Sequence, residues 1–340
     1  MIEIFLATGF FATTLLTYVF MRVITRVGIL DVPNERSSHT QPTPRGGGLS
    51  IVVTFIAFLA ANSWFGFIPV EDSVTTALII GGILITAIGF ADDLRGISAR
   101  WRFLIHLVAV IISLWMLQTL PEIQFLGFEL ESRYVSFVLL SLSLLWVINL
   151  FNFMDGIDGI AGVEVICASA SGALILITKG AHDWSLILGF LGASTAGFLV
   201  WNWPPARVFM GDACSGFVGF TLGMLAIASS ADGIINVWSW LILFGIFVVD
   251  ATTTLVTRIL RGERWFEAHR SHAYQILSRR FNSHGKVSVG VLLINAVWLL
   301  PFAVLATEYP YWAAAICCVA LFPLLFVAIR VGAGRREVGS

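Results

Sequence analysis

Residues 135–159 read VSFVLLSLSLLWVINLFNFMDGIDG, an apolar run that ends in two aspartates. Residues 135–153 of this run carry no charge. A helix that crosses a hydrocarbon core of about 30 Å needs about 20 mostly apolar residues. The stretch therefore predicts a membrane-spanning helix that is followed directly by an acidic turn.

The composition extends this prediction to the whole chain. Of its 340 residues, 58% are hydrophobic and 12% are charged, whereas a soluble domain has about 25% charged residues. We predict an all-α integral membrane protein, a single polytopic membrane domain over residues 1–340 with about eleven transmembrane helices. The predicted spans lie near residues 3–21, 47–65, 76–91, 103–119, 135–153, 160–178, 185–201, 213–230, 235–256, 288–306 and 311–329.

The distribution of basic residues predicts the orientation of these spans. If the N-terminus lies outside, every Lys and Arg except Arg133 and Lys179 falls on the cytoplasmic side, as the positive-inside rule requires. We therefore expect the N-terminus outside and the C-terminus in the cytoplasm. The cytoplasmic loops expected to form the functional site are 22–46, 92–102, 154–159, 202–212 and 257–287.

Five aspartates stand at the cytoplasmic ends of predicted spans. Asp92 and Asp93 end the third span in GFADDLRGI, Asp155 and Asp158 follow the fifth, and Asp212 precedes the eighth in RVFMGDACSG. One such carboxylate is readily explained as a helix-end residue that interacts with solvent and loop arginines. Ionisable groups near membrane depth are costly, however, and usually functional. Five of them on one face predict a functional site.

The central acidic motif has a regular spacing of three. Asn149, Asn152, Asp155 and Asp158 recur every third residue. In a regular α-helix each member would lag the previous one by about 60°, so the four would not share one face. Gly156 loosens the backbone within the motif. We expect the asparagines on the last helical turn, the aspartates on a tight turn, and all four side chains around one polar pocket.

These residue types indicate a metal and a class of substrate. Clustered oxygen ligands without a Cys/His cage suit Mg²⁺, with Mn²⁺ as a second candidate. The cysteines lie in or beside predicted spans and show no metal-binding spacing. Because Mg²⁺ is commonly held by one or two carboxylates together with substrate phosphates, the acidic motifs predict a diphosphate substrate.

Two cytoplasmic segments carry candidate phosphate contacts. Residues 31–50 contain Arg36, His39 and Arg45, followed by three glycines just before a helix. Such glycines let backbone approach an anion, and a helix N-terminus offers free N–H groups to phosphate; a flexible loop with orienting arginines is the alternative. The second segment reads EAHRSHAYQ within 257–287, and its candidates for phosphate contact or proton relay are His269, Arg270 and His272.

Together these motifs resemble the polyprenyl-phosphate N-acetylhexosamine-1-phosphate transferases, membrane enzymes that load a sugar-1-phosphate from a UDP-sugar onto undecaprenyl phosphate. The resemblance runs from about residue 22 to residue 285. The family's paired-aspartate motif matches Asp92-Asp93-Leu94-Arg95, its N-x-x-N-x-x-D-G-x-D-G motif matches 149–159, and its metal-associated aspartate matches Asp212. The resemblance implies ten or eleven spans, an outside N-terminus and a cytoplasmic site in the bacterial inner membrane.

The last cytoplasmic loop departs from the family pattern. Arg270 and His272 remain, but Ala273-Tyr274-Gln275 stand where further histidines are common. This argues against the peptidoglycan branch, which acts on UDP-muramoyl-pentapeptide, and favours the branch that starts O-antigen or related surface glycans. UDP-GlcNAc is the default donor, with UDP-FucNAc or UDP-QuiNAc as alternatives.

The resemblance also implies residue roles. Mg²⁺ on Asp212, with help from Asp155 or Asp158, would bridge the donor diphosphate, and the Asp92–Asp93 pair would position or deprotonate the lipid phosphate. The catalytic candidates are Asp92, Asp93, Asp155 and Asp158; the metal ligands are Asp212 and Asp155; the substrate-binding candidates are Asn149, Asn152, Arg45, His39, Arg270 and His272. The expected partners are a UDP-N-acetylhexosamine and undecaprenyl phosphate, without nucleic acid, and the resemblance alone implies a homodimer.

Two other classes of protein compete with this interpretation. An ion-coupled transporter also buries acids among many helices, but its sites lie at the bilayer midplane, whereas these carboxylates flank the spans. A lipid phosphatase would hydrolyse a diphosphate without a nucleotide. Asp250, within the ninth span, is expected to bond locally to Thr254, and His284 is expected to be a solvated loop residue.

Overall fold

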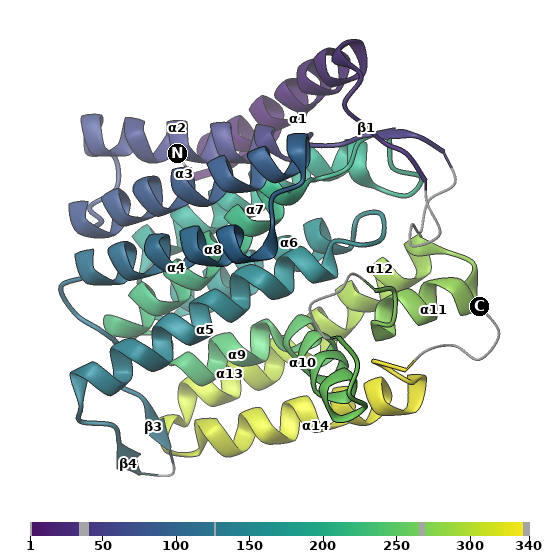
Figure 1. The fold of residues 1–340 in the computed structure, drawn as a ribbon. Coiled ribbons are helices and arrows are strands. Elements are labelled where there is room, and N and C mark those ends of the chain that lie inside the picture. Colours follow the sequence, from purple (N-terminus) through teal and green to yellow (C-terminus); the bar gives the residue numbers. More distant parts are fainter. Residues whose placement is uncertain (1, 34–40, 126, 265–268, 336–340) are drawn as a thin grey trace.

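The computed structural model describes residues 2–33, 41–125, 127–264 and 269–335, and these form a bundle of long helices (Figure 1). The helices are α1 (Ile2–Val27), α2 (Leu49–Phe65), α3 (Asp72–Arg95), α4 (Ala99–Met116), α5 (Arg133–Met154), α6 (Ile160–Thr178), α7 (His182–Asn202), α8 (Asp212–Ala231), α9 (Val237–Leu243), α10 (Gly245–Leu260), α11 (Ala273–Phe281), α12 (His284–Ile294), a π-helix (Asn295–Leu299), α13 (Leu300–Glu308) and α14 (Ala313–Val331). Two short antiparallel pairs join β1 (Leu30–Asp31) to β2 (Thr43–Pro44) and β3 (Gln124–Phe125) to β4 (Phe128–Glu129).

The helices confirm an all-α membrane protein. Within the described ranges, nine helical segments are long and apolar enough to cross a membrane, and the bent pair α9–α10 adds a tenth. Helix α2 is a shorter apolar helix of 17 residues. Each predicted span falls on one of these segments, while the number that cross the membrane and the orientation of the termini stay predictions.

One predicted span differs from the structure in shape. Residues 235–256 form two helices, α9 and α10, that meet at an angle of 79°. The break falls at Phe244 and Gly245, where the chain passes very close to α14: a Cβ on Gly245 would lie 2.6 Å from Leu321 Cδ2. Helix α10 therefore leaves the direction of the bundle (Figure 1).

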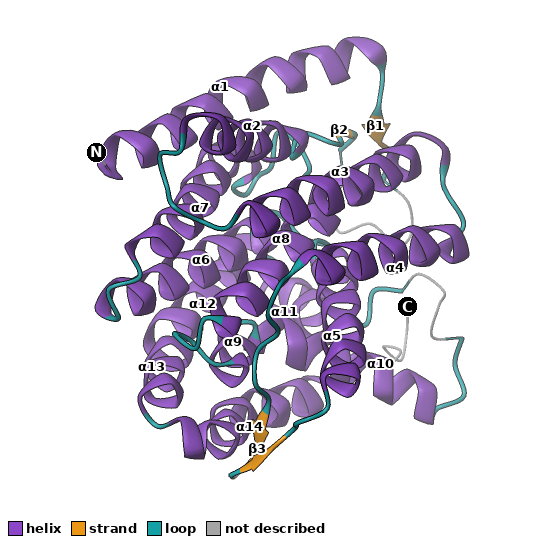
Figure 2. Ribbon diagram, turned by 90° about the vertical axis from the view of Figure 1, so that its left-hand side faces the viewer, coloured by secondary structure: helices purple, strands orange, loops and turns teal. Residues whose placement is uncertain are grey.

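Helix α8 lies at the centre of the bundle, enclosed by its neighbours (Figure 2). The whole of its apolar window is buried inside the protein, and it packs chiefly on α3 and α5. Gly89 on α3 allows α3 and α8 to approach each other closely, since a Cβ there would lie 2.6 Å from the carbonyl oxygen of Asp212. The end of α3 is thereby pressed against the beginning of α8.

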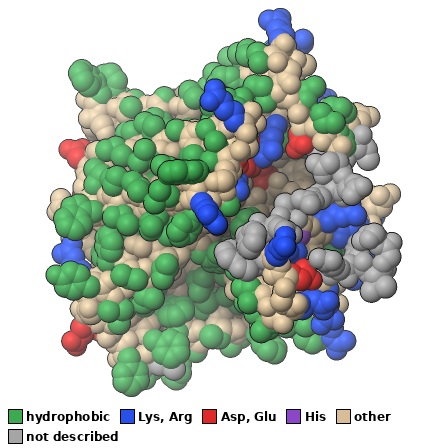
Figure 3. All heavy atoms as spheres, in the orientation of Figure 1, with side chains coloured by type: hydrophobic (Ala, Val, Ile, Leu, Met, Phe, Trp, Pro, Cys, Tyr) green, Lys and Arg blue, Asp and Glu red, His purple; other side chains and the backbone are tan. Residues whose placement is uncertain are grey.

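The outer surface is apolar, as a lipid-facing surface requires. Large hydrophobic side chains cover most of the visible face, while Lys and Arg side chains gather towards the right-hand end (Figure 3). Three exposed aromatic residues, Trp64, Trp115 and Tyr134, lie where α2 and α4 end and α5 begins. These helix ends are opposite to the acidic ends, and aromatic residues of this kind are typical of a membrane–water interface.

Candidate active site

The paired aspartates at the end of α3 lie against the first residues of α8. Asp93 accepts the N–H of Asp212 on Oδ1 at 3.0 Å and the N–H of Ala213 on Oδ2 at 3.1 Å. The first N–H groups of a helix have no partner within it, and a carboxylate is favourable at this positive end. Asp93 thus caps α8 from a neighbouring helix, and its side chain is only 3% exposed.

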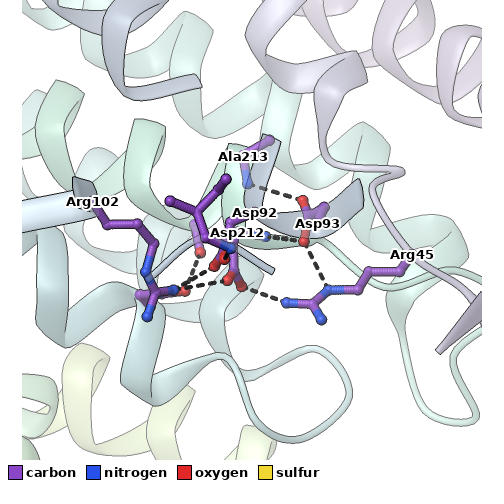
Figure 4. A network of polar contacts seen from close by, with 9 residues as sticks. Arg45, Asp92, Asp93, Arg102, Asp212 and Ala213 are labelled. Atoms are coloured by element: carbon purple, nitrogen blue, oxygen red, sulfur yellow. Dashed lines mark hydrogen bonds and ion pairs between the residues drawn. The ribbon is translucent and has the colours of Figure 1, made fainter. Parts of the chain in front are cut away.

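Two arginines connect three of the predicted carboxylates (Figure 4). Arg45 binds Asp93 Oδ1 through Nε at 2.9 Å and Asp212 Oδ1 through Nη2 at 2.6 Å. Arg102 Nη1 binds Asp92 Oδ2 at 2.5 Å and Asp212 Oδ2 at 3.3 Å. Asp212 therefore lies between the two guanidinium groups, and three aspartates against two arginines leave one negative charge.

Arg102 was not among the predicted site residues. It comes from the first turn of α4, which follows α3 after a short connection. Gly96 ends α3 in the left-handed conformation, with φ of 66°, and lets the chain turn back so that Arg102 faces Asp92. The sequence contained a signal for this contact: an acidic helix end is followed by a glycine and then by a basic residue in the first turn of the next helix.

Asp155 is the unpaired carboxylate of the cluster. It stands immediately after α5, as its C-cap, and no residue in the described ranges hydrogen-bonds its side chain. Burial raises the pKa of the Asp155 carboxyl well above its ordinary value; the Asp212 carboxylate adds to the rise, and the Arg45 guanidinium opposes it. The negative end of α5 also disfavours an anion here. A cation beside Asp155 would relieve both effects.

Asp158 faces different partners from Asp155. Its Oδ2 accepts the N–H of Ala206 at 3.1 Å and lies 3.3 Å from Nδ1 of His284. Its carbonyl oxygen accepts the hydroxyl of Ser288 at 3.0 Å. These contacts attach the turn to α12, so the expectation that His284 is a solvated loop residue is wrong: long-range packing brings it to Asp158. A catalytic role for Asp158 stays a prediction.

Asn152 lies on the last turn of α5, as predicted, whereas Asn149 lies one turn earlier. Within the described residues, neither side chain hydrogen-bonds one of the aspartates. Asn149 Nδ2 donates back to the carbonyl oxygen of Leu145 at 2.7 Å. Asn152 Oδ1 accepts the hydroxyl of Ser215 at 3.0 Å and so joins α5 to α8. Substrate binding by either residue remains a prediction.

The glycines after Arg45 do not offer free N–H groups to an anion, and that prediction is wrong. Gly46 and Gly47 donate to the carbonyl oxygen of Phe209 at 3.1 and 3.0 Å, and Gly48 donates to that of Met210 at 3.1 Å. A Cβ on Gly48 would lie 2.5 Å from Cys214 Cβ. The glycines serve close packing, which brings Arg45 beside Asp212.

The second basic segment is built around Asp250. Its Oδ1 accepts the Ala273 N–H at 2.9 Å and lies 3.3 Å from His272 Nδ1, while Oδ2 accepts the Tyr274 N–H at 2.9 Å. The predicted bond from Thr254 is confirmed at 3.1 Å, but Asp250 also caps α11. His272 is buried against Asp250. Substrate contact by His272 stays a prediction.

The remaining basic candidates are placed less fully. Arg270 is half-buried, and its carbonyl oxygen accepts Nη2 of Arg279 at 3.1 Å. The pKa of His269 is lowered to about 3, mainly by burial and to a smaller extent by the neighbouring His272 and Arg258. His39 lies outside the described residues, as does Arg36.

The donor atoms fit Mg²⁺ only if the substrate contributes as well. Among the described residues, no three His, Cys, Asp or Glu side chains form a group that could hold a metal ion. Asp155 and Asp212 nevertheless supply hard oxygen donors, and Mg²⁺ is usually held by one or two carboxylates plus phosphates. The unpaired Asp155 carboxylate is the donor that the protein's own contacts leave available. The metal stays a prediction.

Comparison with known proteins gives a consistent result. A family model described as glycosyl transferase family 4 matches residues 75–230, which include all five of the predicted aspartates. The chain is 29% identical to the probable undecaprenyl-phosphate N-acetylglucosaminyl 1-phosphate transferase of Bacillus subtilis, over 86% of this chain and 81% of that one.

Two further relatives come from other bacteria. The decaprenyl-phosphate N-acetylglucosaminephosphotransferase of Mycobacterium leprae is 31% identical over 79% of this chain and 74% of its own length. The phospho-N-acetylmuramoyl-pentapeptide-transferase of Chlamydia trachomatis is 32% identical over 70% of this chain and 76% of its own length. The similarity in each case extends well beyond the residues that the family model matches.

Proposed function

Because the chain belongs to the polyprenyl-phosphate N-acetylhexosamine-1-phosphate transferase family and is a glycosyl-1-phosphate transferase, we propose the following reaction for it. An N-acetylhexosamine-1-phosphate passes from a UDP-sugar to undecaprenyl phosphate, and UMP is released. A lipid phosphate oxygen forms a bond to the β-phosphorus. The bond from that phosphorus to the bridging oxygen breaks, and UMP leaves with the electron pair.

One observation supports this proposal most directly: the unpaired Asp155 carboxylate lies in the same electrostatic cluster as Asp212 and the arginines that flank it. Mg²⁺, when bound by Asp212 and Asp155, would neutralise the donor diphosphate. Arg45 and Arg102 hold carboxylates in the structure, and guanidinium groups bind phosphate oxygens with the same fork geometry. An incoming diphosphate can therefore exchange with a carboxylate as their partner.

The structure favours different roles for the paired aspartates. Both oxygens of Asp93 accept N–H groups of α8, and Arg45 binds Oδ1 as well, which suits a residue that positions the others. Asp92 is more accessible, with 10% of its side chain exposed against 3% for Asp93. Asp92 is thus the better candidate for contact with the lipid phosphate. That phosphate needs little deprotonation near neutral pH, so we assign Asp92 orientation and charge balance.

The donor and the pathway are finer parts of the proposal. The names of two relatives specify N-acetylglucosamine, which supports UDP-GlcNAc as the default donor. UDP-FucNAc and UDP-QuiNAc remain alternatives, and the proposed role is to start O-antigen or related surface glycans. The similarity to the Chlamydia trachomatis enzyme supports a second candidate, the peptidoglycan reaction on UDP-muramoyl-pentapeptide. Assays with each of these donors separate the candidates.

We further propose that the protein resides in the bacterial inner membrane with its site facing the cytoplasm. The apolar helices establish a multi-pass membrane protein, and the basic residues support the orientation. A homodimer is part of the proposal on the strength of the resemblance alone.

The test is release of UMP by the purified protein. Wild type should release UMP only when UDP-sugar, undecaprenyl phosphate and Mg²⁺ are all present. Asp212→Asn should lower kcat by about 10² or more, as loss of one electrostatic stabiliser does. Asp72→Asn is the control, because this exposed aspartate lies at the opposite end of α3 from the site. Release without the lipid would indicate hydrolysis, and near-wild-type activity of Asp212→Asn would refute the metal assignment.

A further inference from the structure

The end of α5 lacks the cap that closes other helices of this protein. Helices α2, α3 and α14 end at Gly66, Gly96 and Gly332, each left-handed with its N–H bonded back to the helix. Helix α5 ends at Asp155, with φ of −86° and ψ of 50°, outside the left-handed region. The last carbonyl groups of a helix have no partner within it. Side chains from elsewhere in the protein, water or a ligand satisfy such groups.

The hydroxyl of Tyr274 supplies this partner. Tyr274 lies in α11 and is 3% exposed, and its Oη donates to the carbonyl oxygen of Phe153 at 3.0 Å. Gly156 packs against the same hydroxyl, because a Cβ at Gly156 would lie 2.1 Å from Oη. One hydroxyl therefore contacts the backbone on both sides of Asp155.

Tyr274 is itself held firmly by α10. The N–H groups of Ala273 and Tyr274 donate to the buried carboxylate of Asp250, each at 2.9 Å. His272 and Gln275 close the same helix start with a reciprocal capping box. The position of the hydroxyl is thus fixed by contacts that lie outside the acidic cluster.

The other end of the acidic turn is attached to the next helix. His284 and Ser288 of α12 contact Asp158 through its carboxylate and its carbonyl oxygen. Helices α11 and α12 together hold the turn at both of its ends. Between these attachments stands Asp155, whose side chain has no partner in the described residues. The backbone of this turn therefore sets the point from which the Asp155 side chain projects.

We propose that Tyr274 is a positioning residue for the transfer reaction: its hydroxyl fixes the end of α5 and thereby the direction of the Asp155 carboxylate. This inference rests on the function proposed above. The hydroxyl touches no reacting atom, so its effect is on the orientation of the site. Misplacement of a catalytic group by about 1 Å can cost about 10²-fold in rate.

The first test is Tyr274→Phe, which removes one oxygen and keeps the ring. We expect kcat to fall about tenfold or more, with a smaller change in KM for the UDP-sugar, because the donor contacts remain. Tyr309→Phe is the matched control, since Tyr309 is an exposed tyrosine before α14. If wild type releases no UMP, the proposed function fails. If wild type is active and Tyr274→Phe keeps its kcat, the positioning role is refuted.

A double substitution tests the contact between the Tyr274 hydroxyl and the backbone at Gly156, on which the proposal rests. Gly156→Ala alone should inactivate the protein, because its Cβ would collide with Tyr274 Oη. With that oxygen removed, the nearest side-chain atoms lie 3.1 and 3.2 Å away, at Gln275 Nε2 and Tyr274 Cζ. Gly156→Ala combined with Tyr274→Phe should therefore be more active than Gly156→Ala. A double variant no better than Gly156→Ala would contradict the proposal.

Hydrogen–deuterium exchange provides a measurement that is independent of activity. Tyr274→Phe should raise exchange in a peptide that covers residues 152–160, while Tyr309→Phe should leave it unchanged. Unchanged exchange in Tyr274→Phe would overturn the inference whether or not the protein transfers a sugar phosphate.

Discussion

Substitution of Arg102 by Gln tests the charge balance of the site. Arg102 binds Asp92 and Asp212, and without it these carboxylates face each other with only Arg45 to offset them. At an effective dielectric constant of about 20, unit charges about 4 Å apart interact by about 4 kcal/mol. The Arg102 side chain is 30% exposed, so solvent screens part of this energy. We expect a loss of about 2–3 kcal/mol in transition-state stabilisation, or about 30- to 150-fold in kcat/KM.

The assay is UMP release across a range of UDP-sugar concentrations, and Arg100→Gln is the control. Arg100 is exposed, stands two positions from Arg102 and carries the same charge. Loss of this charge should therefore affect membrane orientation equally in Arg100→Gln and Arg102→Gln. Arg102→Lys keeps the charge but loses the fork geometry, and its activity should lie between wild type and Arg102→Gln. The reasoning is refuted if Arg102→Gln stays within threefold of wild type, or if Arg100→Gln loses as much.

Two further predictions concern stability. Asp93→Asn removes a carboxylate that accepts two N–H groups, so it should cost about 1–3 kcal/mol and lower the Tm in detergent. Asp155→Asn breaks no hydrogen bond among the described residues and should not lower the Tm. Equal Tm values for the two variants would contradict the capping role of Asp93. The pKa of His269 is about 3 in the folded protein, against an ordinary value of 6.5. Between these two pH values the unfolded chain therefore binds more protons than the folded protein. The free energy of unfolding falls as the pH drops below about 6.5. His269→Gln should therefore lose less Tm between pH 7 and pH 5 than wild type, and an identical loss would show that His269 does not contribute.

Local sequence patterns predicted the helices and placed the five aspartates at helix ends, because both depend on short-range properties, while the roles of the aspartates stay predictions. The apolar runs have the length that a membrane requires, so each predicted span coincides with a helical segment. The electrostatic coupling of Asp155 with Asp212 joins residues from different spans, as their common side of the membrane suggested. The motif resemblance then named the family that the comparisons support.

The remaining contacts depend on packing between distant segments. Arg102 reaches Asp92 because α3 turns back into α4. The Tyr274 hydroxyl reaches the backbone beside Asp155 because α11 lies against the end of α5. His284 looked like a loop residue, since nothing near it in sequence indicates Asp158. The glycines after Arg45 suggested phosphate binding because nothing near them in sequence indicates that Phe209 and Met210 accept their N–H groups.

The enclosure of α8 has a consequence for how the protein is made. A helix with no lipid-facing side can take its final place only when α3 and α5 have closed around it. Its first residue, Asp212, meets Asp93 and Arg45 at that same moment. A nascent chain in which α8 has not yet packed against α3 therefore lacks the contacts that join Asp212 to Asp93 and Arg45.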